Sequence, residues 1–387
     1  MRVLVAFDKF KDALSAREAC AVASLALRQR HPDWQVDLCP LTDGGDGFEE
    51  VLGAAVGGQH LPVQVTGPRG GLVEAGFTLV SDKQIPLAIR PRLEFTPSGT
   101  VASPCLAIVE LATASGLSLL PPSQRDPWQA TSFGTGQLIR AAVEHGASAI
   151  LLGVGGSATH DLGLGALTAL GLEFHDLTGA KIRPPLPENW DRIAKIAGTL
   201  PATLPPIYIA CDVSNPLLGP QGAAAVYAPQ KGLHADELPS LENASERIAQ
   251  MLCAHWHQPL TLPGTPGAGA AGGVAFGLAC AARARLIPGF DFVSAWVGLE
   301  EKIAAADLVL TGEGRFDASS HGGKGPGAIS ARAITLGKTV HVFAGQIATS
   351  INPDRLTLHE ITPTDLTLER ALRDTASLLS STILRSL

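Results

Sequence analysis

The residues with the clearest capacity for chemistry follow short apolar runs, in turns rich in glycine. Asp43 and Asp46 share one such turn, Asp212 follows a second apolar run, and Glu313 and Asp317 flank an arginine in a third. Carboxylate oxygens are the ligands that Mg²⁺ prefers, and a well-placed carboxylate can accept a proton from a hydroxyl. These acids are candidates for metal binding and general base catalysis, although Asp and Gly also simply make good turns.

The stretch from Ala149 to Asp161 is the centre of the pattern. An apolar run gives way to Gly155, Gly156 and Ser157, and an Ala/Leu/Gly pattern follows over residues 162–170. This order predicts a strand, a tight loop and a helix. Glycine allows the backbone to approach a ligand closely, and the N–H groups at a helix start attract anions. We expect the loop to bind phosphate; a turn that needs glycine only for its geometry is the alternative.

Basic residues stand in turns of the same kind. Lys11 follows the first apolar run, Lys231 lies in the turn Pro-Gln-Lys-Gly, and Arg315 lies between two acids. A lysine can hold a phosphate as a point charge, whereas an arginine offers paired N–H donors. These three residues could bind a substrate carboxylate or phosphates. Solvated surface positions are the alternative for the lysines, and a structural ion pair is the alternative for Arg315.

Glycine loops, carboxylates and isolated cations are together the groups that phosphoryl transfer requires. In such reactions the protein neutralises the phosphates, positions Mg²⁺ and directs a hydroxyl toward the γ-phosphate of ATP. Asp317 or Asp161 could accept the hydroxyl proton. The sequence has no G-x-x-x-x-G-K-[ST] motif and no complete G-x-G-x-x-G after its first strand. Neither standard nucleotide-binding fold is therefore indicated.

The composition indicates the fold class that positions these residues. The chain has 387 residues, which favours two domains, and 45% hydrophobic residues with 42 glycines favour an α/β protein. The order of predicted elements changes near residue 61, because strands there follow one another without helices between them. The segment 311–317 is predicted as a loop and residues 104–115 as a helix. The predicted strands are 3–7, 36–41, 61–66, 72–80, 84–89, 149–152, 207–210, 306–310 and 339–343.

Charge and cysteine content exclude several classes of partner. The formal net charge is −7, and the pI is near 5.9, so there is no electrostatic footprint for nucleic acid or an anionic membrane. No two of the six cysteines have the close spacing of a zinc or redox motif. The first apolar run is too short for a signal peptide, and no apolar stretch approaches membrane-spanning length. We expect a cytoplasmic protein with a small, soluble substrate.

Seven blocks of the sequence form a recognisable series: Phe7 to Ala16, Asp43 to Gly47, Gly153 to Asp161, Cys211 to Leu217, Pro229 to Gly232, Pro266 to Gly273 and Thr311 to Asp317. These blocks resemble the signature blocks of the bacterial type I glycerate kinase family, and they occur in the family's order. The resemblance covers nearly the whole chain. It implies ATP- and Mg²⁺-dependent phosphorylation of D-glycerate, with 2-phospho-D-glycerate and ADP as products.

The resemblance also implies a domain organisation. A Rossmann/flavodoxin-like parallel-sheet α/β domain would contain residues 1–61 and 284–387. A second, mixed α/β domain, residues 62–283, would be inserted into it. The active site would lie in the cleft between the two domains, and a homodimer is possible. No nucleic acid or membrane partner is expected.

The roles of individual residues are hypotheses at this stage. The catalytic candidates are Asp317, Asp161 and Lys11. The candidates for substrate or phosphate binding are Asp8, Lys9, Gly155, Gly156, Ser157, Lys231, Arg315 and Lys324. The candidates for metal binding are Asp43, Asp46, Asp212 and Glu313.

The chain departs from the family pattern at Phe7, Lys9, His160 and His321. The additional lysine could strengthen carboxylate binding or change which acid is accepted. A kinase of another small hydroxy or sugar acid is therefore an alternative function. Two alternatives belong to other functional classes. The first is a dinucleotide-dependent oxidoreductase, but the sequence lacks the dinucleotide-binding fingerprint. The second is a non-catalytic sugar-acid sensor, but the sequence shows no DNA-binding helix pair and no basic face.

Overall fold

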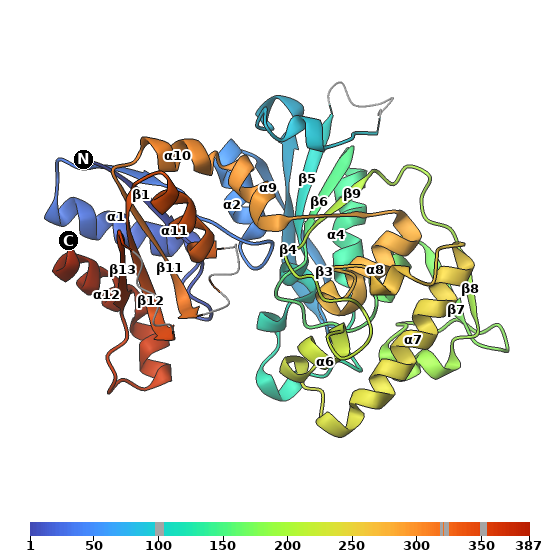
Figure 1. Ribbon diagram of the computed structural model, residues 1–387. Helices are drawn as coiled ribbons and strands as arrows, with labels where there is room; N and C mark the ends of the chain where they lie inside the picture. The colour runs from blue at the N-terminus through green and yellow to red at the C-terminus, as the bar shows by residue number, and fades with distance from the viewer. Residues whose placement is uncertain (97–103, 318–319, 321–324, 349–353) are drawn as a thin grey trace. The chain divides into compact units, whose positions relative to one another are not determined.

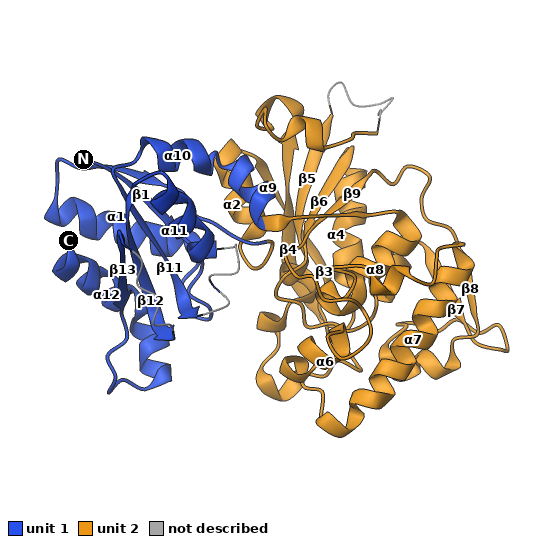
Figure 2. Cartoon of the chain, viewed as in Figure 1, with its two compact units in different colours: residues 1–43, 290–387 blue, residues 44–289 orange. Residues whose placement is uncertain are grey.

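The computed structural model describes residues 1–96, 104–317, 320, 325–348 and 354–387. The chain forms two compact units, shown in different colours in Figure 2. Unit 1 contains Met1–Asp43 and Phe290–Leu387, and unit 2 contains Gly44–Gly289. Each unit has its own sheet and its own buried hydrophobic cluster. The predicted fold class, a parallel-sheet α/β unit with a mixed α/β unit inserted, is confirmed.

The described part of unit 1 contains a five-stranded sheet in the order β13-β12-β11-β1-β2. All neighbouring strands are parallel. Strand β1 is buried along nearly its whole length, as a continuous apolar run in a parallel sheet should be. The strands are β1 (Arg2–Phe7), β2 (Gln35–Leu38), β11 (Leu308–Asp317), β12 (Thr339–Ala348) and β13 (Leu356–Glu360).

Helices cover both faces of this sheet. The capping box of Ser15 and Glu18 starts α1 (Ala16–Arg30), as the sequence predicts. Helix α1 packs beside α12 (Leu368–Ser386) (Figure 1). Helix α11 (Gly325–Thr335) packs on β11 and β12, together with α10 (Leu299–Ala305). Helix α9 (Gly289–Trp296) precedes them.

The direction of the chain across the sheet reverses between β1 and β11. From β1 the chain crosses through α1 to β2 on one side, and from β11 it crosses through α11 to β12 on the other side. Because such crossovers are right-handed, α1 and α11 lie on opposite faces. Ligands of open α/β sheets bind outside the carboxyl ends of the strands at such a reversal. The ends of β1 and β11 are therefore the place in unit 1 to look for a site.

The described part of unit 2 contains a six-stranded mixed sheet in the order β10-β9-β6-β5-β4-β3. Strands β3, β4 and β5 pair antiparallel, and the other pairs are parallel. A two-stranded ladder, β7 with β8, lies apart from it. The bounds are β3 (Gln59–Thr66), β4 (Leu72–Ser81), β5 (Cys105–Glu110), β6 (Ala149–Gly153), β7 (Leu172–His175), β8 (Lys195–Gly198), β9 (Ile207–Ala210) and β10 (Arg285–Ile287).

The helices of unit 2 are rich in small residues. Helix α8 is buried along most of its length, and it packs against α5, α6 and α7. Alanine, with only a methyl group, and glycine, with no side chain, allow this close approach of helix backbones. The helices are α2 (Phe48–Val56), α3 (Leu111–Ser115), α4 (Phe133–Glu144), α5 (Leu164–Ala169), α6 (Ala223–Tyr227), α7 (Leu238–His255) and α8 (Ala270–Ala282).

Two predicted elements of unit 2 are wrong. Residues 104–115, predicted as a helix, form strand β5 followed by the short helix α3. The apolar run is short enough for either structure, and pairing with β4 and β6 on both sides decides for the strand. Residues 84–89, predicted as a strand, contain no strand: Gln84 ends a short 3₁₀ helix (Asp82–Gln84), and a turn follows it. The side chain of Gln84 donates to the carbonyl groups of Val56 and Gly57 at the end of α2.

Two further differences concern unit 1 and the division of the chain. Residues 311–317, predicted as a loop, continue β11, because β12 pairs with it as far as Asp317. The units divide after residues 43 and 289, whereas the sequence suggested residues 61 and 283. Helix α2 belongs to unit 2, since it packs against β4 and β5.

Candidate active site

Three carboxylates gather at the carboxyl ends of the strands in unit 1. Asp8 directly follows β1, Glu313 lies on β11 beside the end of β1, and Asp43 follows the segment that runs along β1 after β2. The pKa of Asp8 is raised to about 7, mainly by burial and also by the charges of Asp43 and Glu313, while Lys9 opposes the shift. Asp43 and Glu313 therefore lie near enough to Asp8 for their charges to affect its pKa, at the reversal point of the sheet.

The two lysines after β1 occupy the same region of unit 1. The backbone N–H of Lys9 donates to Asp8 Oδ1 at 2.7 Å. The backbone of Lys11 passes close to Gly314 on β11. A Cβ added to Gly314 would lie 3.3 Å from the backbone nitrogen of Lys11. The backbone of Lys11 therefore lies against β11, and its side chain is exposed.

Arg315 and Asp317 form an ion pair further along β11. Arg315 Nε donates to Asp317 Oδ2 at 3.2 Å, and the Asp317 N–H donates to Ser320 Oγ at 3.1 Å. The arginine side chain is 62% exposed and the aspartate side chain 29%. An exposed pair of this kind contributes little to stability, so both groups can reorganise around a ligand.

A second group of candidate residues lies at the carboxyl ends of the strands in unit 2. Ala210, Gly153 and Glu110 form one row across β9, β6 and β5. Asp212 follows this row by two residues. Gly44 lies directly against the row, because a Cβ there would be 2.8 Å from the carbonyl oxygen of Ala210. Unit 2 thus brings the glycine loop, the turn of Asp46 and Asp212 to one edge of its sheet.

The glycine loop and the Asp46 turn are in close backbone contact. The N–H of Gly155 donates to the carbonyl of Gly44 at 2.9 Å. Gly156 adopts a left-handed conformation with φ +69°, and a Cβ on it would lie 2.1 Å from Asp46 Oδ1. Glycine is needed at this position both for the backbone conformation and for space. The Asp46 carboxylate is thereby held against the loop.

Glu110 organises this arrangement, although no motif in the sequence marks it as a functional residue. Its side chain is almost completely buried at the end of β5. Oε1 accepts the N–H of Gly47 at 3.1 Å, and Oε2 accepts the N–H of Glu49 at 3.2 Å. A carboxylate at a helix start satisfies N–H groups that otherwise lack partners. Glu110 therefore fixes the start of α2 and, with it, the turn that carries Asp46.

Asp161 caps a helix. Its side chain is fully buried. It accepts hydrogen bonds from the N–H and hydroxyl of Ser132, at 2.7 and 2.8 Å, and from the N–H groups of Gly163 and Gly165. Burial raises the pKa of Asp161, and these hydrogen bonds oppose the shift. Asp161 and Ser132 Oγ accept the N–H groups of Gly165 and Ala166, so these two donors at the start of α5 already have partners within the protein.

Lys231 lies beneath the glycine loop as a buried cation. Its ammonium group donates to Ser157 Oγ at 2.8 Å and to the carbonyl oxygen of Thr159 at 2.7 Å. Burial lowers the pKa of Lys231 to about 7, while the charge of Asp161 opposes the shift. The structure therefore brings Lys231 together with Ser157 and Asp161, three residues that the sequence could only treat separately.

Two departures from the family pattern are packing residues. Phe7 is buried in the core of unit 1, beside Phe10 and Phe343. His160 is fully buried in unit 2, and its Nε2 lies 3.0 Å from Ser245 Oγ. Burial lowers the pKa of His160 to about 3, so its ring is neutral, and Lys231 adds to the shift. Lys324 and His321 lie outside the described residues.

Within the described residues, there is no group of three or more His, Cys, Asp or Glu side chains that could hold a metal ion. Mg²⁺ commonly takes only one or two protein carboxylates and fills its remaining positions with water and substrate phosphates. The carboxylates of Asp8, Asp43 and Glu313 supply the right donor type and a strongly negative environment. Among the helices that the structure describes, none is long and apolar enough to cross a membrane.

A reversal point lined with acids, a glycine loop and a buried lysine define a phosphotransferase-like α/β protein. The sequence model of the glycerate kinase family matches residues 3–386. The chain belongs to the glycerate kinase family.

Individual relatives agree with this assignment. The chain is 36% identical to a glycerate kinase from Bacillus subtilis over 358 residues, which is 91% of this chain and 87% of the relative. It is 35% identical to a glycerate 2-kinase from Escherichia coli over 353 residues, with the same coverage. A crystal structure of a protein assigned as glycerate kinase 2 from Salmonella typhimurium matches 100% of this chain and 96% of its own, with TM-score 0.75 and 35% identity.

Proposed function

We propose that this protein transfers the γ-phosphoryl group of ATP to the 2-hydroxyl of D-glycerate. The observation that carries the proposal is the family match, which extends over nearly the whole chain and includes a relative named as a glycerate 2-kinase. The acids at the reversal point of unit 1 support it, since they supply the groups that such a reaction requires. Family membership favours this reaction over a dinucleotide-dependent oxidation or a sensor function.

We propose Asp43 and Glu313 in unit 1, and Asp46 and Asp212 in unit 2, as the residues that would hold Mg²⁺. The ion, when bound, supplies positive charge that neutralises the phosphates. Burial is the main cause of the raised pKa of Asp8, and the charges of Asp43 and Glu313, which add to it, fit a divalent cation. Chelation with EDTA should abolish turnover, and added Mg²⁺ should restore it.

We assign the role of general base to Asp317 rather than Asp161. Asp317 is partly exposed and has an ion-pair partner that can move, whereas the Asp161 carboxylate is buried and already accepts several hydrogen bonds. A base must reach the proton of the substrate hydroxyl. Lys11, Lys9 and Arg315 would bind the acid's carboxylate or the phosphates as cations of unit 1.

The remaining phosphate contacts are assigned to unit 2. The loop of Gly155, Gly156 and Ser157 presents a backbone without bulky side chains, and Lys231 places a positive charge directly beneath Ser157. Together they would stabilise the negative charge of the transferred group. In this proposal unit 1 supplies the acids of the reaction and unit 2 supplies the phosphate contacts.

Phosphorus NMR of the product formed from D-glycerate, ATP and Mg²⁺ tests this function. The expected product is 2-phospho-D-glycerate; a 3-phosphate would contradict the position, and an unchanged ATP spectrum would contradict the reaction. A panel of small hydroxy acids, assayed by ADP release, tests the identity of the acceptor. The cytoplasmic location and the homodimer stay predictions, which cell fractionation and sedimentation equilibrium would test.

A further inference from the structure

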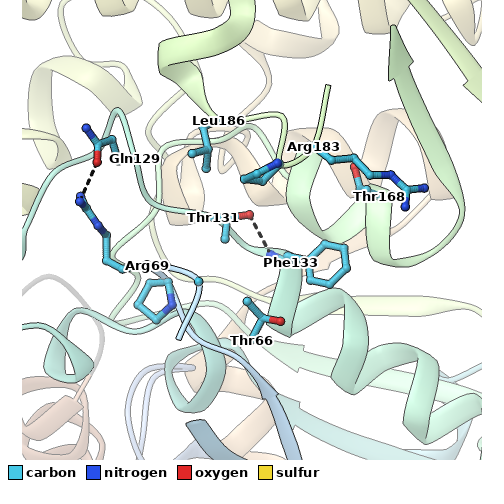
Figure 3. A pocket seen from close by; sticks show the side chains of 11 residues that line it. Thr66, Arg69, Gln129, Thr131, Phe133, Thr168, Arg183 and Leu186 are labelled. Atoms are coloured by element: carbon cyan, nitrogen blue, oxygen red, sulfur yellow. Dashed lines mark hydrogen bonds between the residues drawn. The ribbon is translucent and has the colours of Figure 1, made fainter. Parts of the chain in front are cut away.

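Unit 2 contains a pocket of about 420 Å³ that the residues assigned above do not use (Figure 3). Its walls come from the turn between β3 and β4, the segment before α4, helix α5 and the segment after β7. The N–H of Thr131 donates to the carbonyl of Pro68 at 3.0 Å, which joins two of these walls. The volume lies within the range of sites for small molecules.

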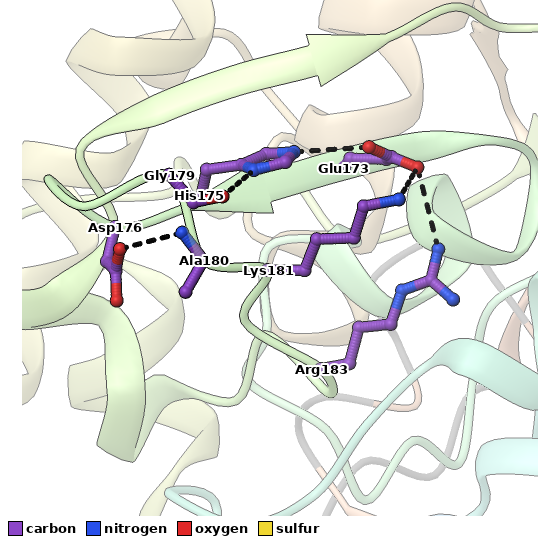
Figure 4. A network of polar contacts seen from close by, with 7 residues as sticks. All are labelled: Glu173, His175, Asp176, Gly179, Ala180, Lys181 and Arg183. Atoms are coloured by element: carbon purple, nitrogen blue, oxygen red, sulfur yellow. Dashed lines mark hydrogen bonds and ion pairs between the residues drawn. The ribbon is translucent and has the colours of Figure 1, made fainter.

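The outer wall of the pocket is held in place by a polar network (Figure 4). Glu173 accepts from Lys181 Nζ at 2.5 Å, lies 3.1 Å from His175 Nε2 and forms a longer ion pair with Arg183 at 3.8 Å. Asp176 closes the turn by accepting the N–H of Ala180 at 3.0 Å. These contacts fix the segment that leads to the pocket residues Arg183, Pro184 and Leu186.

The lining of the pocket combines flat apolar surfaces with cations. Phe133, Leu186 and two prolines supply the apolar surface, and Arg69 and Arg183 supply positive charge. Arg69 donates to Gln129 at 2.7 Å and lies 3.7 Å from Asp126, a long and partly exposed ion pair. Such a pair is weak, and a guanidinium group has five N–H donors, so it can also bind an anion. Arginine also stacks on planar rings.

One wall of the pocket is hydrogen-bonded to the segment that carries the glycine loop. Thr131 and Phe133 line it, and the residue between them, Ser132, binds the carboxylate of Asp161. Asp161 ends the segment that begins with the glycine loop. A second hollow, of about 380 Å³, shares Arg69 and Gln129 with the pocket and reaches Gly232. Gly232 directly follows Lys231 in the chain.

We propose that this pocket binds the base and ribose of ATP. The inference rests on the proposed function, in which the two organic reactants are glycerate and ATP. Glycerate has three carbons and no planar or apolar part, and it would leave most of 420 Å³ and the apolar wall unused. A nucleoside has a planar base for the apolar wall and hydroxyl groups for the threonine and glutamine side chains. Arg69 then faces the first phosphate.

Filling the pocket tests this inference. Leu186→Trp should raise the KM for ATP at least tenfold, because the indole would occupy the space of the base, while the KM for glycerate stays within twofold. Leu177→Trp is the matched control: Leu177 lies nearby on the same segment and is 94% exposed. Circular dichroism and thermal unfolding establish that both variants are folded. An unchanged KM for ATP in folded Leu186→Trp would overturn the inference.

Photolabelling of the wild-type protein gives a second test that needs no variant. 8-Azido-ATP should label peptides that carry Gln129 to Phe133 or Arg183 to Leu186, and excess ATP should prevent the labelling. Labelling confined to other peptides would overturn the inference. If 8-azido-ATP labels these peptides but the protein releases no ADP with any hydroxy acid, the proposed reaction is contradicted and the inference of a nucleoside pocket still holds.

Discussion

The ammonium group of Lys231 lies 2.8 Å from the hydroxyl oxygen of Ser157, a residue 74 positions earlier in the chain. This contact places a buried cation under the loop assigned to phosphate binding. Burial of a charge is unfavourable unless partners compensate it, and the depressed pKa of Lys231 shows that the compensation is incomplete. A residue that costs stability at such a position is a strong candidate for function.

Replacing Lys231 with Met should reduce kcat at least a hundredfold and leave the protein folded. The pKa of Lys231 is about 7 in the folded state, below the usual value of 10.5. Between these pH values the unfolded chain binds more protons, so this residue makes stability rise with pH in that window. The variant should lose this part of the pH dependence in urea unfolding. The exposed Lys195→Met should change neither property; full activity of Lys231→Met would contradict its role.

Replacing Glu110 with Gln should destabilise the start of α2 and lower kcat. The glutamine oxygen can accept only one of the N–H groups of Gly47 and Glu49, so one buried donor loses its partner. Such a loss costs about 1–3 kcal/mol. We expect kcat to fall about tenfold with little change in the KM for glycerate, since Asp46 loses its fixed position. Glu144→Gln, on the surface of α4, is the control, and equal kcat in both variants would contradict the positioning role.

Replacing Gly156 with Ala tests the contact between the glycine loop and Asp46. The new Cβ would lie 2.1 Å from Asp46 Oδ1, and φ is +69°. Gly179→Ala is the matched control, because Gly179 has φ +86° but no atom within 4 Å of its Cβ position. Both variants carry backbone strain of about 1 kcal/mol. Steady-state kinetics should show a large loss of turnover for Gly156→Ala alone.

The two candidate bases can be separated by one substitution each. Asp317→Asn should reduce turnover strongly while the affinity for ATP and the stability change little, because this side chain is partly exposed. Asp161→Asn should instead lower the free energy of unfolding by about 2–4 kcal/mol, since an amide cannot accept every hydrogen bond that the buried carboxylate accepts. Normal turnover of Asp317→Asn would rule out its assignment as the base.

A histidine pair in unit 1 predicts a loss of stability in acid. His341 Nδ1 lies 2.9 Å from His359 Nε2, and the rings stack with Phe343. Burial lowers the pKa of His359 to about 4, and the neighbouring His341 adds to the shift. The unfolded chain therefore binds more protons as the pH falls from 6.5 to about 4, and stability falls with it. His359→Phe should flatten this slope in urea unfolding, and the exposed His255→Phe should not.

The three acids of unit 1 could be located from the sequence alone. Asp8, Asp43 and Glu313 were recognisable because each follows an apolar run, and strand ends in parallel sheets meet at one edge. The parallel pairing of β1 with β11 brings two of them together, as this rule requires. By contrast, the helix predicted over residues 104–115 is a strand, because the neighbours of β5 in the sheet cannot be read from its own apolar pattern.

The sequence by itself determined the family, the α/β class and most candidate residues, since motif type and order along the chain carry that information. Only the tertiary structure decided what the candidates contact. The Asp161 carboxylate accepts a hydrogen bond from Ser132, which lies 29 residues away in the sequence. The Glu110 carboxylate accepts a hydrogen bond from Gly47, which lies 63 residues away. The physical reason is that a carboxylate's function depends on the donors around it, and folding brings those donors from distant segments.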